Sequence, residues 1–141
     1  MTATAALAGV VGLWLGMVVA ISFLEAPLKF RAPDVTVRIG LGIGRLVFRA
    51  LNAVETVLAV VVVVTLIAGH VPGPVLGTAV AAVGVLALQL VAIRPVLNRR
   101  SDRVLAGEDP PRSRAHLGYV GTEVVKVALL LAAGVLALSG L

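Results

Sequence analysis

The sequence predicts an all-α fold, a four-helix transmembrane bundle, on three observations. Four long apolar runs occur in a chain of 141 residues, 60% of the residues are hydrophobic and 13% are charged, and the mean hydropathy is +1.09. The basic residues gather in two connections between the runs. Since a soluble domain of this size needs more polar surface, we expect residues 1–141 to form one four-span integral membrane domain.

The first run, Ala5–Leu24, has about the 20 residues that a helix needs to cross a hydrocarbon core about 30 Å thick. It lacks a basic segment ahead of the apolar one and is followed by Glu25-Ala26-Pro27. We therefore expect a retained helix rather than a cleaved signal peptide.

The second run, Leu51–Ala68, is expected to belong to a helix that begins earlier and projects from the membrane. Arg45, Arg49 and Asn52 lie on a helical period that leads into it, and nothing between Leu46 and Ala68 breaks a helix. The following residues, 69–74, include one histidine, two glycines and two prolines, which predicts a short turn.

The third and fourth runs, Val75–Ile93 and Val120–Leu138, complete the bundle, and a polar connection that contains Pro110 and Pro111 joins them. Shifting the chain by 68 residues also suggests two tandem helical hairpins, with chance matches as the alternative. The aligned pairs are Gly9/Gly77, Gly16/Gly84, Pro27/Pro95, Arg31/Arg99, Asp34/Asp102 and Glu55/Glu123.

The distribution of positive charge predicts the orientation. Eleven of the twelve basic residues lie in the two connections, and the termini and the 69–74 turn carry none. The positive-inside rule therefore puts both termini outside. The connections hold Lys29, Arg31, Arg38, Arg45 and Arg49, and then Arg94, Arg99, Arg100, Arg103, Arg112 and Arg114.

The bias toward Ala, Val, Gly and Arg is typical of a bacterium of high GC content, so we expect a multi-pass protein of a bacterial plasma (inner) membrane. The expected partners of the arginines are anionic lipid headgroups, and we expect no nucleic acid.

A buried polar cluster is predicted on two helical stripes. Ionised groups at membrane depth are costly and should face the bundle interior in pairs, so we expect an ion pair between Glu55 and Lys126. Both an ion-binding or solute-binding role and a purely structural clamp remain open. The stripes are Arg45, Phe48, Asn52 and Glu55, then His116, Tyr119, Glu123 and Lys126, with Gln89 at similar depth.

Glu25, His116 and Tyr119 are expected near the interface, close to the connections. His116 and Tyr119 would either anchor the helix there or, in the case of His116, gate a proton path.

Small residues predict close helix contacts. Gly12/Gly16 and Gly73/Gly77 have the Gly-x-x-x-Gly spacing, which would serve packing within the bundle or between subunits. We expect a homo-oligomer or a membrane-protein partner.

Other chemistries lack their residues. The chain has no cysteine, and His70 and His116 are expected at opposite faces, so we expect no metal site and no cofactor. Gly40-Leu41-Gly42-Ile43-Gly44 misses the dinucleotide spacing because Arg45 stands at the third glycine. Without a nucleophile and base pair, we expect no catalytic residues and no enzyme.

The sequence resembles a group of small four-span membrane proteins of unknown function, which includes a eukaryotic transmembrane protein linked to platinum-drug resistance. The resemblance is carried by Trp14, Phe23, residues 29–33, residues 44–48 and His116, although the proline usual after the Phe48 position is absent. It implies a four-span topology and brings no settled activity.

Together these observations favour a small transporter or channel-like protein for a proton, an ion or a small polar solute, with the Glu/Lys cluster as its site. The alternative is a non-catalytic membrane assembly or partner subunit.

Overall fold

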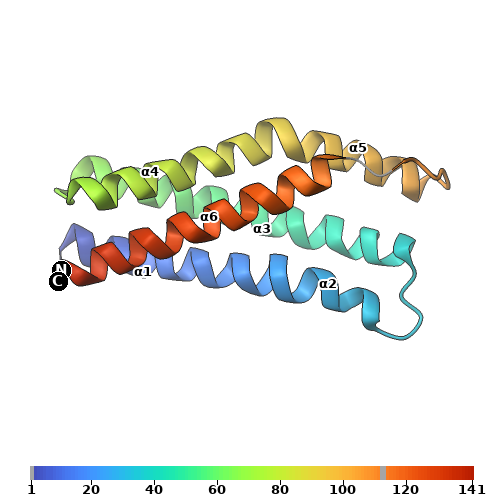
Figure 1. Ribbon diagram of the computed structural model, residues 1–141, viewed down its shortest axis with the longest axis horizontal. Coiled ribbons are helices and arrows are strands. Elements are labelled where there is room, and N and C mark those ends of the chain that lie inside the picture. The colour runs from blue at the N-terminus through green and yellow to red at the C-terminus, as the bar shows by residue number, and fades with distance from the viewer. Residues whose placement is uncertain (1, 112–113) are drawn as a thin grey trace.

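In the computed structural model, which describes residues 2–111 and 114–141, the chain folds as four helical rods with no strand in those residues. Figure 1 shows the rods side by side along one long axis. The elements are α1 (Ala3–Val18), η1 (Val19–Glu25), α2 (Ala26–Leu28), η2 (Lys29–Arg31), α3 (Val37–Ala68), α4 (Gly73–Leu88), η3 (Gln89–Ile93), α5 (Arg94–Leu105) and α6 (Arg114–Ser139). All four rods are long and apolar enough to cross a membrane, which confirms the all-α bundle and its four spans.

Both termini and the turn after α3 lie at one end of the bundle, and the two arginine-bearing connections lie at the other (Figure 1). We call the latter the arginine-rich end. This arrangement is the topology expected from the sequence, although Arg112 lies outside the described residues. The chain is a multi-pass membrane protein.

Two rods extend beyond the hydrocarbon thickness at the arginine-rich end. Helix α3 begins at Val37, where Thr36 accepts a hydrogen bond of 3.2 Å from the amide of Ile39. Its 32 residues span about 48 Å at about 1.5 Å per residue, so it projects as expected. Helix α5 makes the third rod longer than predicted. A connection is expected to begin at Arg94, but the chain stays helical as far as Leu105. Gly107 follows the helix with a φ of +91°, a conformation that glycine adopts readily.

Two π-helical segments interrupt the first and third rods. Pro27 and Pro95 lack the amide that would continue an α-helix, and their rings crowd the preceding turn. The residue before each proline bonds one position farther back than usual: the Ala26 amide donates to Ile21 and the Arg94 amide to Gln89. The segments therefore form where a proline follows, and they lie at the depth of the polar residues of the bundle.

The rods pack in a ring in which α1 lies between α3 and α6, and α4 lies between α6 and α3. Helices α3 and α6 are thus diagonally opposite, and α3 with α4 is the most loosely packed neighbouring pair. The half of the core near the termini is apolar. It contains Leu7, Val11, Trp14, Val18, Ala59, Val62, Val75, Ala79, Ala82, Leu86, Leu130, Ala133 and Ala137.

Buried positions recur 68 residues apart, which supports the hypothesis of two tandem hairpins. The π segments recur at nearly the same spacing, at Val19–Glu25 and Gln89–Ile93. The buried pairs are Leu7/Val75, Val11/Ala79, Trp14/Ala82, Val18/Leu86, Leu51/Tyr119, Glu55/Glu123 and Val62/Leu130. Each hairpin therefore presents the same face to the core.

The glycines of the Gly-x-x-x-Gly pairs do not pack within the bundle. Gly12, Gly16, Gly73 and Gly77 are exposed, and a Cβ added at any of them would meet no atom within 4 Å. Of the two roles that the sequence left open, close packing inside the bundle is therefore wrong.

Candidate functional site

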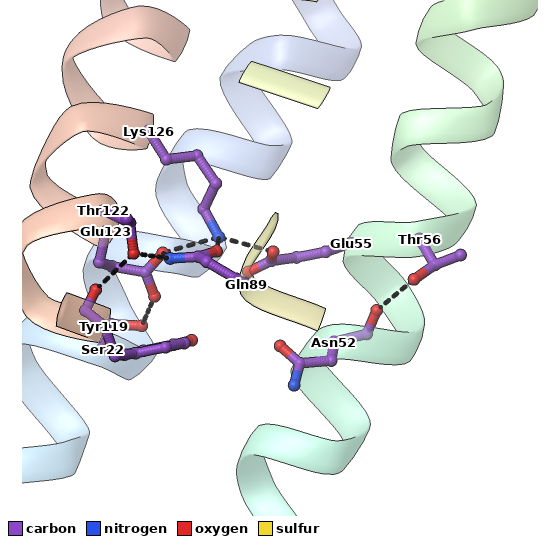
Figure 2. A network of polar contacts seen from close by, with 9 residues as sticks. All are labelled: Ser22, Asn52, Glu55, Thr56, Gln89, Tyr119, Thr122, Glu123 and Lys126. Carbon is purple, nitrogen blue, oxygen red and sulfur yellow. Dashed lines mark hydrogen bonds and ion pairs between the residues drawn. The ribbon is translucent and has the colours of Figure 1, made fainter. Parts of the chain in front are cut away.

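The bundle contains a buried polar group, the central cluster, made of Ser22, Glu55, Gln89, Thr122, Glu123 and Lys126. Lys126 of α6 lies at its centre, and its ammonium contacts three groups (Figure 2). It donates to Glu55 Oε2 at 2.7 Å and to Gln89 Oε1 at 2.9 Å, and it lies 2.6 Å from Glu123 Oε1. Since an ammonium has three protons, this donor is saturated. The predicted Glu55–Lys126 ion pair is present.

The two carboxylates of the central cluster are held differently. Glu123 Oε2 accepts a 2.6 Å bond from Ser22, and its Oε1 accepts from Lys126 and, at 3.3 Å, from Gln89. Glu55 Oε2 has only Lys126, and Glu55 Oε1 is buried without a hydrogen-bond partner among the described residues. The buried indole N–H of Trp14 likewise has no hydrogen-bond partner among the described residues. Glu55 is thus the under-coordinated member.

All four principal side chains are removed from the surroundings of the bundle. Glu55, Gln89, Glu123 and Lys126 are at most 1% exposed. They come from three rods, with Ser22 of η1 adding the fourth, so the cluster ties all four rods together. Burying charges is tolerated when they are paired and hydrogen-bonded, which explains why these groups face inward.

The two glutamates occupy equivalent positions of the two hairpins, and Lys126 breaks that equivalence. The position 68 residues before Lys126 is Leu58, an apolar residue. Two carboxylates facing one another across the bundle would repel, and the single ammonium between them offsets that repulsion. The three charged groups linked by direct contacts, Glu55, Glu123 and Lys126, therefore hold two negative charges and one positive charge.

Two residues expected in the cluster lie elsewhere. Asn52 and Arg45 line a cavity of about 140 Å³ nearer the arginine-rich end, which we call the arginine pocket; its walls are Arg45, Phe48, Arg49, Asn52, Arg94 and Asn98. Arg45 pairs with Asp102 of α5. The helical stripe was right, but ten residues separate Arg45 from Glu55, about 15 Å along a helix, which is too far for contact. Figure 2 shows the Asn52 amide apart from the hydrogen-bonded side chains.

Two aromatic rings lie between the central cluster and the arginine pocket. Phe48 and Tyr119 meet edge to face, with centroids 5.8 Å apart. The Arg94 guanidinium carbon lies over both rings, 4.9 Å from the Phe48 centroid and 4.4 Å from that of Tyr119. These are favourable cation–π contacts. Tyr119 therefore faces the bundle interior, at 7% exposure, instead of anchoring the helix at its surface.

The other residues expected at the interface take separate positions. His116 is exposed, three residues before Tyr119. Glu25 faces Lys29 of the next turn at 3.6 Å. Neither is in contact with the central cluster, and the described residues contain no group of three or more His, Cys, Asp or Glu that could hold a metal ion.

Sequence reasoning did not find Ser22, Thr122 or Arg94 as site residues. Thr122 accepts from Gln89 at 3.0 Å, and Ser22 reaches Glu123 from a π segment. A signal for the altered helix geometry was present, because Pro27 and Pro95 follow Ser22 and Gln89 by five and six residues.

Comparison of the chain with known protein families, curated proteins and solved structures finds no match.

Proposed function

We propose that the chain is a small proton-binding transporter or channel-like protein of a bacterial inner membrane, with Glu55 as its exchangeable carboxylate. The observation that carries this proposal is that two buried carboxylates share one lysine. Lys126 lies 2.7 Å from Glu55 and 2.6 Å from Glu123, which leaves one negative charge without a directly bonded cation.

A proton is the simplest cation that balances this charge. It would bind to Glu55 Oε1, the carboxylate oxygen of the cluster that lacks a hydrogen-bond partner in the described chain. Glu123 is less suited, because both of its oxygens already accept hydrogen bonds. Ionisable residues inside a membrane span are candidates for proton relays in pumps and transporters.

Access to Glu55 differs between the two ends. The arginine pocket reaches Asn52, one helical turn from Glu55. Toward the termini, the bundle interior is filled by apolar side chains such as Val11, Val62 and Leu130. Exchange from the arginine-rich end therefore has the shorter path to Glu55, whereas release at the other end needs a second conformation.

The orientation follows from the arginines. Under the positive-inside rule, the arginine-rich end faces the cytoplasm and both termini face outside. Glu55 would then exchange protons with the cytoplasmic side in the described conformation.

The experiment is proton flux into liposomes that contain the purified chain and a pH-sensitive dye, under an imposed pH gradient. Glu55→Gln keeps the shape of the side chain and removes the proton site, so it should reduce flux to that of protein-free liposomes. Glu108→Gln is the matched control, since Glu108 is exposed and pairs with Arg103 at 3.6 Å outside the bundle. It should leave flux unchanged.

Unchanged flux in Glu55→Gln would reject this role. Flux of sodium or potassium without flux of protons would mean that the transported ion is a metal cation and not a proton. If the wild-type protein is folded by circular dichroism and conducts neither protons, sodium nor potassium, transport of these cations is rejected.

One observation favours a second candidate, an assembly subunit. Gly9, Gly12 and Gly16 leave open space on the outer face of α1, which would let another helix approach closely. This role predicts that the chain purifies from its native membrane with a second copy or another membrane protein, and that Gly12→Leu abolishes the association. Recovery of the single chain alone would contradict it.

A further inference from the structure

The loosely packed seam between α3 and the α4–α5 rod changes from basic to apolar along its length. At the arginine-rich end it forms the arginine pocket, with Arg45, Arg49 and Arg94 among its walls. Farther along, the same two rods form a groove of about 300 Å³, which we call the apolar groove. Its lining is Thr56, Ala59, Val60, Val63, Val64, Val83, Leu86, Ala87 and Leu90.

The pocket and the groove lie on the same helical stripes. On the third rod, Asn98, Arg94, Leu90, Ala87 and Val83 succeed one another at intervals of three or four residues, so they share one face. On α3 the stripe from Arg49 through Asn52 and Thr56 behaves in the same way. The two cavities therefore follow one another along a single seam.

Arg94 has buried N–H groups without an acceptor in the described chain. Its Nε and Nη2 are buried and have no hydrogen-bond partner among the described residues, and it makes no ion pair there. The cation–π contacts with Phe48 and Tyr119 leave these N–H groups without an acceptor in the part of the chain that the structure describes. Guanidinium N–H groups that are buried without an acceptor are costly unless an oxyanion accepts from them.

The surroundings of Arg94 also attract an anion. Arg49 has no acidic partner in the described chain, and Arg45 has Asp102, so the pocket keeps a surplus of two positive charges. At the seam related by the 68-residue shift, Ala26, His116 and Leu117 stand where this seam has Arg94, Phe48 and Arg49. Arg94 and Arg49 thus have no basic counterpart at the related positions.

The depth of the pocket suits a phospholipid headgroup. About 20 residues span the hydrocarbon core, so counting from the end of α3 at Ala68 and from the start of α4 at Gly73 puts its boundary near Arg49 and Ile93. The arginines lie at that boundary, and the apolar groove lies within the hydrocarbon. We propose that this seam binds one anionic phospholipid, with its phosphate in the arginine pocket and an acyl chain along the apolar groove.

The test is native mass spectrometry of the full chain in mild detergent, titrated with phosphatidylglycerol, with phosphatidylcholine of the same acyl chains and with inorganic phosphate. We expect one phosphatidylglycerol per chain, bound about tenfold or more tightly than phosphatidylcholine, whose choline would face the surplus positive charge. Inorganic phosphate lacks the acyl chain and should bind more weakly still.

Two pairs of variants locate the site. Arg94→Gln should weaken phosphatidylglycerol binding about tenfold or more, and Arg103→Gln, whose side chain lies outside the pocket, should not. Ala87→Trp fills the apolar groove and should weaken binding, whereas Ala81→Trp, on an exposed part of α4 outside the groove, should not. If Arg94→Gln does not fold by circular dichroism, Arg49→Gln replaces it, because Arg49 is exposed.

Equal binding of the two lipids would overturn the proposal, as would unchanged binding in Arg94→Gln. Phosphate that binds as tightly as phosphatidylglycerol would assign the pocket to a soluble anion and reject the lipid. These outcomes are measured as lipid binding and proton transfer is measured as flux in Glu55→Gln, so the failure of one proposal can be told from the failure of the other.

Discussion

Replacement of Lys126 by methionine should destabilise the bundle more than any other single charge removal. Methionine keeps an unbranched apolar stem like that of lysine and removes the ammonium, which holds Glu55 at 2.7 Å, Glu123 at 2.6 Å and Gln89 at 2.9 Å. Breaking a buried ion pair by removing one partner costs about 3–5 kcal/mol. Because Lys126 serves two carboxylates, we expect Lys126→Met to cost about 5 kcal/mol.

The assay is reversible unfolding in mixed micelles, with the denaturing detergent as titrant and circular dichroism as readout. The control is Arg103→Met, which removes an exposed cation 3.6 Å from Glu108 and should cost less than about 1 kcal/mol. A third protein, Glu55→Gln/Glu123→Gln/Lys126→Met, carries no charge in the cluster and should recover at least about 2 kcal/mol of the loss, because it leaves no uncompensated carboxylate.

An unfolding free energy of Lys126→Met within about 1 kcal/mol of the wild type would contradict this dependence on the ammonium. An uncharged triple variant as unstable as Lys126→Met would contradict it as well. Either result would mean that the carboxylates do not depend on the ammonium for their burial.

Three further predictions concern single groups. In the same unfolding assay, Glu123→Gln should cost about 1–2 kcal/mol more than Glu55→Gln. The reason is that Glu123 accepts bonds from Ser22, Gln89 and Lys126, whereas Glu55 accepts one hydrogen bond. Equal losses would contradict the different coordination of the two carboxylates. Tyr119→Phe should change stability by less than about 1 kcal/mol, since the buried hydroxyl has no partner in the described chain, and Tyr119→Ala should cost about 3–5 kcal/mol. Gly12→Leu should leave the unfolding free energy of the monomer within about 0.5 kcal/mol, because a Cβ there meets open space, and a larger loss would place Gly12 in a packed contact.

The four helices and the main ion pair were predictable because both follow from the cost of polar groups in hydrocarbon. An apolar run of about 20 residues must be helical there, and a glutamate and a lysine within such runs must find one another. The helical stripes placed Glu55 and Glu123 correctly, and the depth of Gln89 placed it with them.

Arg45 and Asn52 share a helical stripe with Glu55 and were therefore expected in the same cluster. Arg45 lies ten residues from Glu55, about 15 Å along the helix, and both residues line the arginine pocket instead. The interior position of Tyr119 depends on Phe48 and Arg94 of neighbouring rods, and such contacts have no signature in a single helix. Ser22, which bonds Glu123, lies in the π segment ahead of Pro27. In the sequence, Pro27 was the available signal of that altered helix geometry. The polarity of residues 94–105 predicts a loop, but these residues are helical, because an amphipathic helix beyond the membrane is equally polar.

Infrared difference spectroscopy of the purified chain across a pH titration tests whether Glu55 is the carboxylate of the cluster that takes up a proton. We expect a band from a protonated carboxyl group that is lost in Glu55→Gln and kept in Glu123→Gln. A band that survives Glu55→Gln and disappears in Glu123→Gln would contradict it.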